Sequence, residues 1–551
     1  MKEKILTALT ETVTELINNP DDKIKLALTV PKDNSHGDFS TNAAMIIAKK
    51  IGKNPREAAI EIVDLLNEKL VGIATCEIAG PGFINFKLSG DAEAQVFKQL
   101  FDKGKNIGFQ NIGNGKKVNV EYVSANPTGP LSVGHGRNAA VGDVIASLYK
   151  AVGYDVTREY YFNDAGNQMT VLAKSVQTRY LQLFDSKVKL DENAYQGEYI
   201  IDIAQTIKDE YGDSLKETNE LDVFKKYAVD AMFDMIKVSL KKMRVEHDVY
   251  FNERSLYTDG KIEETLKKID ELGLSYEKDG ALWFKAEQFG AEKDRVLVKS
   301  SGEPTYRLPD FAYHINKFKR GFDLIVDIFG ADHQAQYPDV IACMKAMGFD
   351  TEKIKVVIYQ FVTIVENGEA VKMSTRKANY ITLDELMDDV GVDATRYFFV
   401  MRRLGSHLEF DIEVARKHSL DNPVFYVQYA HARISSIFRH CAEKKPDINI
   451  DEISSENVKP ELLIQQEEQD LISHIAQFED TISVAAKTCE PHRLTGYLEK
   501  IAELFHRYYN LHHVVVDDDE TTKARLALVT MTQRVIKNGL EILGVNAPVK
   551  M

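Results

Sequence analysis

The spacing of apolar residues divides the chain into three regions, and the first is mixed. Residues 42–48 read as a helix, and residues 82–86 alternate apolar and polar positions as a strand does. The polar, glycine-rich stretch 111–117 predicts a linker or hairpin. These patterns predict an α+β N-terminal domain over residues 1–112.

Strand and helix patterns alternate in the second region. A helix is predicted over 136–151, ended by Gly153. Strands are predicted at 118–123, 156–162, 324–328 and 356–359. Because strands alternating with helices favour a parallel sheet, we expect a Rossmann-type α/β core over 113–412. It carries a helical, charged insertion over about 170–275.

The third region, residues 413–551, shows only helical periodicity and predicts an α-helical bundle. The polar segment 443–455 predicts a long loop, and the acidic run 517–520 a solvated turn. The whole chain is therefore expected to be multidomain.

Composition narrows the class of protein. The chain has 551 residues, 44% hydrophobic residues and a formal charge of −15, as expected of a folded protein. It has no apolar run of the ~18 residues that a membrane helix needs, and its start lacks a signal peptide's apolar core. We therefore expect a cytoplasmic protein without a membrane partner. The acidic balance lowers the expectation of a nucleic-acid partner without excluding one, because phosphates respond to local basic patches.

The four cysteines lie far apart and form no C-x-x-C pair, which argues against a zinc site or a disulfide framework. We expect no permanently bound metal.

The first chemical signal lies between the first strand and first helix of the α/β region, in the segment Glu121 to Arg137. Ligands of parallel sheets bind at the carboxyl ends of strands, and a helix start attracts phosphate. The letters Gly134-x-Gly136-x-x-Ala139 match a dinucleotide fingerprint, but ten residues separate the strand from Gly134, so we reject a dehydrogenase. The alternatives left open are a nucleotide site, with Gly134 admitting a purine or ribose beside His135, and a His135 that only caps the helix.

The second signal is the cationic segment Val371-Lys-Met-Ser-Thr-Arg-Lys377, which follows a polar turn beyond a strand. Such a loop can neutralise charge that builds on a pyrophosphate leaving group. A solvated basic turn is the alternative for this segment taken alone.

Together these motifs resemble a class I aminoacyl-tRNA synthetase. Ser132-Val-Gly-His135 corresponds to the HIGH motif and Lys372-Met-Ser-Thr-Arg376 to KMSKS. Further blocks resemble the arginyl-tRNA synthetase family and span nearly the whole chain. They are 35–42, 126–131, 161–168, 391–398, 422–433 and 544–551.

The resemblance implies ATP-dependent formation of arginyl-adenylate and transfer of arginine to tRNA. L-arginine, ATP with Mg²⁺ and tRNA for arginine are the implied partners, and a monomer is expected. Because arginine is a rigid fork of donors, its site needs carboxylates and planar acceptors. The implied arginine-binding residues are Glu121, Asn126, Tyr306, Asp310 and Gln334, with Asp310 pairing with the guanidinium.

The resemblance assigns the remaining roles in the same way. His135, Ser132, Lys372 and Arg376 are the implied catalytic residues, and Lys372 is the main pyrophosphate-stabilising cation. The implied ATP-binding residues are Gly134, His135, Gly330, Asp332, Lys372, Met373 and Ser374. The implied tRNA-binding residues are Tyr426, Gln428, Tyr429, Arg433 and Met551, although apolar spacing around Tyr429 also fits a helix core. The N-terminal domain is expected to hold the tRNA D-loop.

Two positions depart from the family pattern. Ser132 stands where the motif has its first histidine, and Thr375 stands where a lysine is frequent. Ser132 supports one alternative, a tRNA-binding protein without chemistry; a small-molecule nucleotidyltransferase with the same sheet is another. The acidic and cationic residues kept in the motifs favour the enzyme over the tRNA-binding protein. The N- and C-terminal domains favour it over the nucleotidyltransferase.

Overall fold

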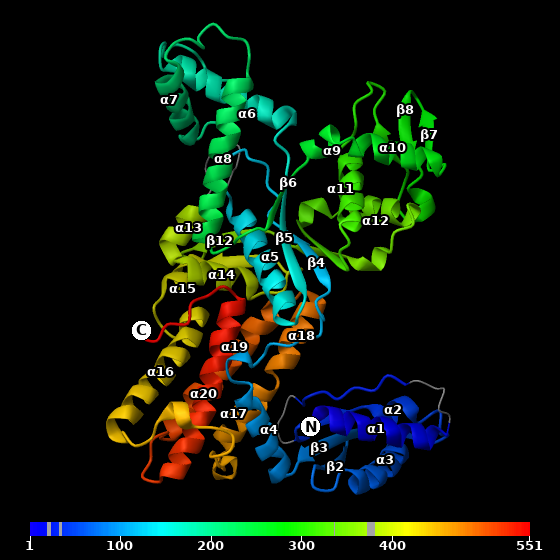
Figure 1. Cartoon of the computed structure of the whole chain (residues 1–551), viewed down its shortest axis with the longest axis vertical. Coiled ribbons are helices and arrows are strands. Elements are labelled where there is room, and N and C mark those ends of the chain that lie inside the picture. Colours follow the sequence, from blue (N-terminus) through cyan, green and yellow to red (C-terminus); the bar gives the residue numbers. More distant parts are fainter. Residues whose placement is uncertain (19–23, 32–35, 335–336, 372–380) are drawn as a thin grey trace.

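The structure is a computed structural model that describes residues 1–18, 24–31, 36–334, 337–371 and 381–551. It has a central body from which two projections rise, with an N-terminal domain and a helical C-terminal domain below (Figure 1). None of the described helices is both long and apolar enough to cross a membrane.

The N-terminal domain packs helices on a small sheet. Its antiparallel strands lie in the order β1–β3–β2, with bounds Phe39–Thr41, Phe83–Leu88 and Ala74–Ala79. Helices α1 (Lys2–Ile17), α2 (Ala43–Ile47) and α3 (Pro55–Lys69) bury their apolar residues in a core separate from that of the body. Helix α4 (Gly90–Asp102) then leads into the central body. The predicted helix at 42–48 and strand at 82–86 are both present.

A five-stranded parallel sheet forms the centre of the body, in the order β11–β10–β4–β5–β6. The bounds are Ile354–Tyr359, Leu324–Gly330, Lys117–Glu121, Asp155–Phe162 and Val249–Asn252. Helix α5 (Val133–Ala151) connects β4 to β5 and is buried along most of its length. The chain continues from β4 to one side and returns with β10 on the other, which opens a crevice at the carboxyl end of β4.

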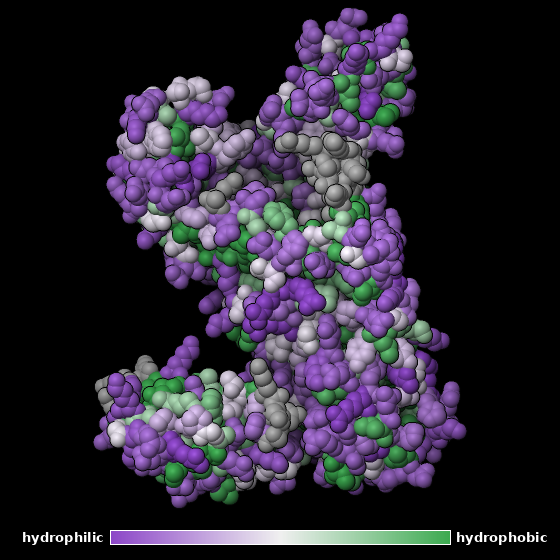
Figure 2. Space-filling view, turned by 180° about the vertical axis from the view of Figure 1, so that it is seen from behind, coloured by the Kyte–Doolittle hydropathy of each residue, from purple (hydrophilic) through white to green (hydrophobic). Residues whose placement is uncertain are grey.

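Two excursions from this sheet make the projections, seen from behind in Figure 2 with a hollow between them. The helical arm consists of α6 (Gly166–Gln182), α7 (Tyr199–Tyr211) and α8 (Asp222–Lys242). Strand β6 then rejoins the sheet, so it divides the region that we expected to be one insertion.

The second projection, the lobe, follows β6. It contains α9 (Arg254–Thr258), α10 (Lys261–Glu271), α11 (Arg307–Lys319) and α12 (Tyr337–Ala346). Its antiparallel sheet joins β7 (Ser275–Lys278), β8 (Ala281–Phe284) and β9 (Arg295–Val298). The sequence analysis did not anticipate this sheet.

A third small sheet connects the body to the C-terminal domain. It orders β13 (Glu369–Ala370), β12 (Val362–Glu366) and β14 (Leu408–Asp411). Helices α13 (Leu383–Val390), α14 (Val392–Val400) and α15 (Ile412–Arg416) pack beside it. The C-terminal domain is the predicted bundle. Its helices are α16 (Pro423–Lys444), α17 (Gln466–Ala476), α18 (Phe478–Thr488), α19 (His492–Leu511) and α20 (Asp519–Ile542).

Candidate active site

Three acidic side chains stand in register on adjacent strands at the crevice. Glu121 on β4 pairs with Asp327 on β10 and with Glu159 on β5. All three carboxylates are buried. Burying charge in this way requires paired cations, because an unpaired buried charge is costly.

Helix α11 supplies those cations. Lys317, fully buried, donates to Glu121 at 2.5 Å and to Asp327 at 2.6 Å. Arg320 binds both oxygens of Glu159, at 2.6 and 2.7 Å. Burial alone would raise the pKa of Glu159, but Arg320, Lys317 and Tyr313 hold that pKa below its ordinary value. The acids are therefore fixed in one arrangement.

Asp310 lies two turns before Lys317 on α11 and has a different environment. Its carboxylate makes no hydrogen bond or ion pair with any other described residue, although its carbonyl oxygen contacts Nδ1 of His314 at 2.8 Å. Burial raises the pKa of Asp310 to about 7, and the charges of Glu253 and Glu121 add to that rise. His314 and His333 oppose it. A half-buried acid without a partner fits a cationic ligand.

Glu253 lies at the end of β6 and is held by two polar side chains from β5 and its end. Tyr161 donates to one carboxylate oxygen at 2.5 Å and Asn163 to the other at 2.7 Å. Asn163 also donates its backbone N–H to the side chain of Asn126, whose amide in turn donates to Gln168 at 3.1 Å. The predicted residue Asn126 is thus exposed and joined to the same polar wall.

Both carboxylate oxygens of Glu121 already accept hydrogen bonds, so Glu121 is less available to a ligand than the sequence analysis expected. One of its oxygens accepts from Lys317 and the other from Ser124 at 2.9 Å. The backbone turns sharply beyond it, with φ of 67° at Val123 and 43° at Ser124. A β-branched residue rarely adopts such a φ, and strain of this kind gathers at functional sites. Asn138 secures the turn by accepting the N–H of Val123 at 2.9 Å.

The start of α5 carries the HIGH-like residues. Ser132 is the N-cap, and its hydroxyl accepts the N–H of His135 at 3.4 Å. Among the described residues, a Cβ on Gly134 would meet only Ser132 Oγ, at 3.7 Å, so none of them fills this space. By contrast, a Cβ on Gly136 would lie 2.5 Å from Leu383. Gly134 therefore leaves room for a ligand, whereas Gly136 serves packing.

The KMSKS-like residues Lys372, Met373, Ser374 and Arg376 lie outside the described residues. The chain on either side of them is firmly attached. Val371 donates its N–H to Ile364 of β12 at 2.9 Å, and Leu383 donates to Leu131 at 2.8 Å. Thr382 forms an antiparallel bridge with Ser132. The described residue Thr382, which follows the second motif, is therefore a neighbour of Ser132 in the first.

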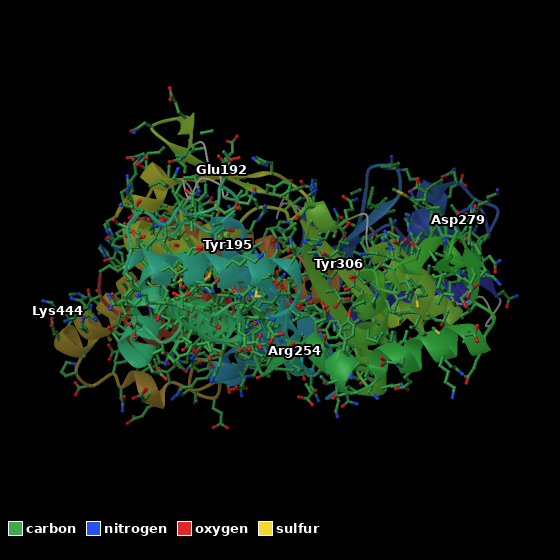
Figure 3. The ribbon with its side chains drawn as sticks, turned by 90° about the horizontal axis from the view of Figure 1, so that it is seen from above. Glu192, Tyr195, Arg254, Asp279, Tyr306 and Lys444 are labelled. Carbon is green, nitrogen blue, oxygen red and sulfur yellow. The ribbon has the colours of Figure 1, made fainter. Side chains whose placement is uncertain are left out.

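The remaining predicted ligands are spread around the crevice. Gly330 ends β10, and a Cβ there would lie 2.5 Å from Asp332, which is exposed together with Gln334. Tyr306 precedes α11 and is 88% exposed, so the structure does not bring it onto Asp310. In the view from above, Tyr306 lies in projection between Tyr195 of the arm and Asp279 of the lobe (Figure 3).

The predicted tRNA residues fall into two groups. Tyr426, Tyr429 and Arg433 gather on α16 beside α19, where His506 lies against both tyrosine rings. Arg433 also lies over the ring of Tyr509, with 4.3 Å to the ring centroid.

Gln428 and Met551 differ from this aromatic cluster. The amide of Gln428 is buried and donates to Asp393 and to the carbonyl of Asn546, both at 2.8 Å. Met551 is half exposed at the chain end. Gln428 therefore fastens the C-terminal tail to the central body, and no amide hydrogen remains to donate to tRNA.

Several residues of the site escaped the sequence analysis. A signal was present for some of them, because Tyr313, Lys317 and Arg320 follow one another at helical spacing among the apolar residues Phe311, Ala312 and Ile315. Polar residues on the buried face of a helix need partners. The partners on the three strands, and Glu253 on β6, follow only from sheet order.

Among the described residues, no group of three or more histidine, cysteine, aspartate or glutamate side chains is arranged to hold a metal ion. All four cysteines are free and buried.

Comparisons with known proteins match this architecture. The family models that match are Arginyl tRNA synthetase N terminal domain over residues 1–88, tRNA synthetases class I (R), catalytic domain, over 95–399, and DALR anticodon binding domain over 427–551. An arginine–tRNA ligase of Desulfotalea psychrophila is 46% identical over 527 residues, 96% of this chain and 95% of the relative. One of Salinibacter ruber is 43% identical over the full length of both chains.

A solved structure agrees in fold. Arginyl-tRNA synthetase of Thermus thermophilus aligns with a TM-score of 0.77 over 99% of this chain and all of that one, at 20% identity. The predicted fold class and the predicted resemblance are both confirmed.

Proposed function

The chain belongs to the arginyl-tRNA synthetase family, and we propose that it joins L-arginine to its cognate tRNA at the expense of ATP. Arginine first reacts with ATP to give arginyl-adenylate and pyrophosphate. The adenylate then passes arginine to the terminal adenosine of tRNA, and AMP is released. The protein contributes positioning and charge stabilisation rather than a covalent nucleophile.

The observation that carries this proposal is the carboxylate of Asp310, which has no hydrogen-bond or ion-pair partner among the described residues. Glu253 and Glu121 are the acids whose charges act on it, and the neighbouring acids Asp327 and Glu159 are already neutralised by α11. A guanidinium fits there, because it supplies the missing positive charge and several donors at once. Asn126, Tyr306 and Gln334 complete the proposed arginine site, with Tyr306 approaching only when the substrate is bound.

ATP is assigned to the space beside the α5 start. Gly134 leaves room there, and the helix N-terminus favours phosphate. We assign His135 to the phosphates and Lys372, with Arg376, to the pyrophosphate leaving group; Gly330, Asp332, Met373 and Ser374 complete the ATP site. Mg²⁺ is expected to arrive with ATP as part of the substrate.

The tRNA is assigned to the terminal domains. Tyr426, Tyr429 and Arg433 present an aromatic and cationic surface suited to stacking unpaired bases. The N-terminal domain is assigned to the tRNA D-loop. We further propose that the enzyme is a cytoplasmic monomer.

Charging of tRNA tests the function. Purified protein should form arginyl-tRNA from arginine, ATP and active cognate tRNA, and should exchange pyrophosphate into ATP when tRNA is present. Binding of tRNA without either reaction would leave a tRNA-binding protein, and pyrophosphate exchange without tRNA binding would indicate a small-molecule nucleotidyltransferase. Lysine in place of arginine should give no product.

A further inference from the structure

The β4–α5 loop (residues 122–132) is held by two different parts of the molecule. Its first half is fastened to the central body, where Asn138 accepts from Val123 and Tyr160 donates to the carbonyl of Ala125 at 2.7 Å. Its second half, from Asn126 to Pro130, is contacted by the helical arm. This half carries Asn126 and leads directly to Ser132, so its position matters to both substrate sites.

Tyr199, the first residue of α7, contacts the loop directly. Its phenol donates to the backbone carbonyl of Thr128 at 3.3 Å. A Cβ on Gly129 would lie 2.8 Å from the same phenol oxygen, so the loop approaches the tyrosine as closely as a glycine allows. The positive-φ region is not involved at Gly129, so the glycine serves close approach alone.

Two further contacts join the arm to this half of the loop. Gln168 on α6 accepts from Asn126, and Tyr195 bonds with the side chain of Thr128. The backbone N–H of Tyr195 donates to Ser175 of α6 at 3.0 Å, which fixes the segment before α7 to the arm. Asn163, directly after β5, also donates its backbone N–H to Asn126, so the arm and the sheet together hold this half of the loop.

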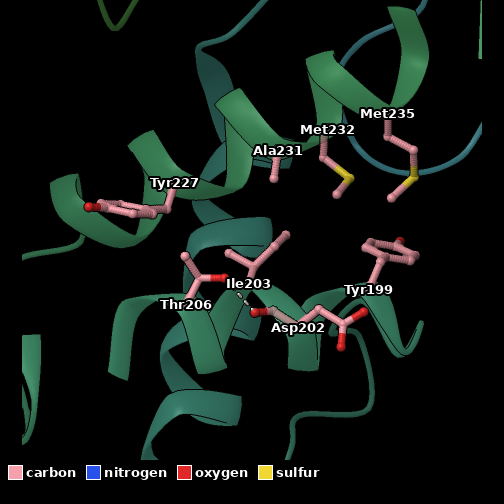
Figure 4. A pocket seen from close by; sticks show the side chains of 8 residues that line it. All are labelled: Tyr199, Asp202, Ile203, Thr206, Tyr227, Ala231, Met232 and Met235. Carbon is pink, nitrogen blue, oxygen red and sulfur yellow. Dashed lines mark hydrogen bonds between the residues drawn. The ribbon is translucent and has the colours of Figure 1, made fainter. Parts of the chain in front are cut away.

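A cavity of about 220 Å³ lies behind Tyr199, between α7 and α8. The ring of Tyr199 forms one end of the cavity lining, opposite the side chains of Met232 and Met235 (Figure 4). Tyr227 lines the other end of the same cavity, and its phenol donates to Glu210 instead of to the loop. The ring of Tyr199 thus has space to withdraw without repacking a core.

We propose that Tyr199 is a positioning residue through which the helical arm holds the Asn126–Pro130 half of the β4–α5 loop in its arginine-binding arrangement. The proposal rests on the function given above, because it concerns the same arginine site. Loss of the contact frees the loop and so weakens arginine binding, while tRNA binding and folding stay unchanged.

The first test compares Tyr199→Phe with Tyr227→Phe, the matched change on the same cavity. Pyrophosphate exchange with tRNA present should show the KM for arginine raised about five-fold in Tyr199→Phe, the scale of one hydrogen bond. Tyr227→Phe should match wild type. The KM for tRNA and the melting temperature should not change in either variant. An unchanged KM for arginine in Tyr199→Phe would overturn the proposal.

A double-mutant cycle with Gly129→Ala makes the test specific. In wild type the added methyl displaces the phenol and breaks its bond to Thr128. In the Tyr199→Phe background the nearest remaining ring atom is at 3.4 Å, an ordinary contact. The double variant should therefore be no worse than Tyr199→Phe alone. Additive losses would show that the two positions act separately and would overturn the proposal. An inactive wild type would instead refute the proposed function.

Discussion

The backbone N–H of Ser132 donates to Nδ1 of His135 at 3.2 Å, while the hydroxyl of Ser132 accepts the N–H of His135 at 3.4 Å. Since a backbone amide can only donate, Nδ1 is the acceptor, and the neutral ring carries its proton on Nε2. Burial lowers the pKa of His135, which favours the neutral ring. The serine that replaces the first HIGH histidine thus caps the helix and sets the tautomer of the second.

Removing this cap should weaken the start of α5. Ser132→Ala loses the hydroxyl acceptor and should destabilise the protein by about 1 kcal/mol, with a modest fall in activation rate. Ser132→Thr keeps the hydroxyl and should behave nearly as wild type. Thermal unfolding beside pyrophosphate exchange checks both variants. Equal melting temperatures for the alanine and threonine variants would mean that the cap contributes nothing.

Lys317 should contribute far more to the stability of the protein than Lys319, an exposed lysine on the same helix. Lys317→Met leaves Glu121 and Asp327 without their shared cation and should destabilise by about 3–5 kcal/mol, the range for breaking a buried ion pair. The control is Lys319→Met on the same helix, where Lys319 pairs with Glu264 at the surface and should cost less than about 1 kcal/mol. Chemical denaturation of both variants measures the difference. Similar losses of stability in the two variants would contradict the buried ion-pair network of Lys317, Glu121 and Asp327.

Arginine binding should depend on pH through Asp310, whose pKa burial raises to about 7. Guanidinium binding needs the ionised form, so kcat/KM for arginine in pyrophosphate exchange should rise with pH and level off above about 7. The folded protein holds the proton more tightly than the unfolded chain, so this group's contribution to stability falls as pH rises through the same range.

Glu253 provides the control for that profile. Glu253→Gln removes a negative neighbour that raises the pKa of Asp310, so the midpoint should move to lower pH. His314 and His333 act in the opposite direction and stay in place. If the midpoint of kcat/KM against pH does not move in Glu253→Gln, the pH dependence belongs to a group other than Asp310.

The aromatic and cationic surface on α16 should govern tRNA affinity alone. Arg433→Gln removes the cation that lies over Tyr429 and Tyr509, and should raise the Kd for tRNA about ten-fold. Arg439→Gln, one turn and a half further along the exposed side of α16, is the matched control and should have a smaller effect. Filter binding of tRNA measures both. A changed KM for arginine would argue against a role confined to tRNA.

Local patterns of apolar residues along the chain were sufficient to predict the central strands and helix of the fold. The alternation of strands at Val118 and Val156 with the helix containing Val141 fixed β4, α5 and β5, because period and length agree there. Strand β6 has four residues and β7–β9 are equally short, so their patterns were too brief to separate from the surrounding helices.

The site was only partly accessible to sequence reasoning. The resemblance pairs Ser132 with a second motif at 372–376, which lies outside the described residues; the structure shows the bridge from Ser132 to Thr382. The pairing of Glu121 with Asp327 depends on strand order and register, which no local pattern encodes. Gln428 illustrates the opposite case: a polar residue on a helix suggested RNA contact, but its partner Asn546 comes from a distant segment.

Substitution of Asp310 tests the central claim, that this acid receives the guanidinium, most directly. The measurement is kcat/KM for arginine in pyrophosphate exchange with tRNA present, for wild type, Asp310→Asn and the control Asp294→Asn, whose carboxylate lies in the lobe bound to Tyr276. We predict a loss of at least about 100-fold for Asp310→Asn with little change for the control, since a charged, desolvated contact disappears. Asp310→Asn that activates arginine as well as wild type does would contradict the account.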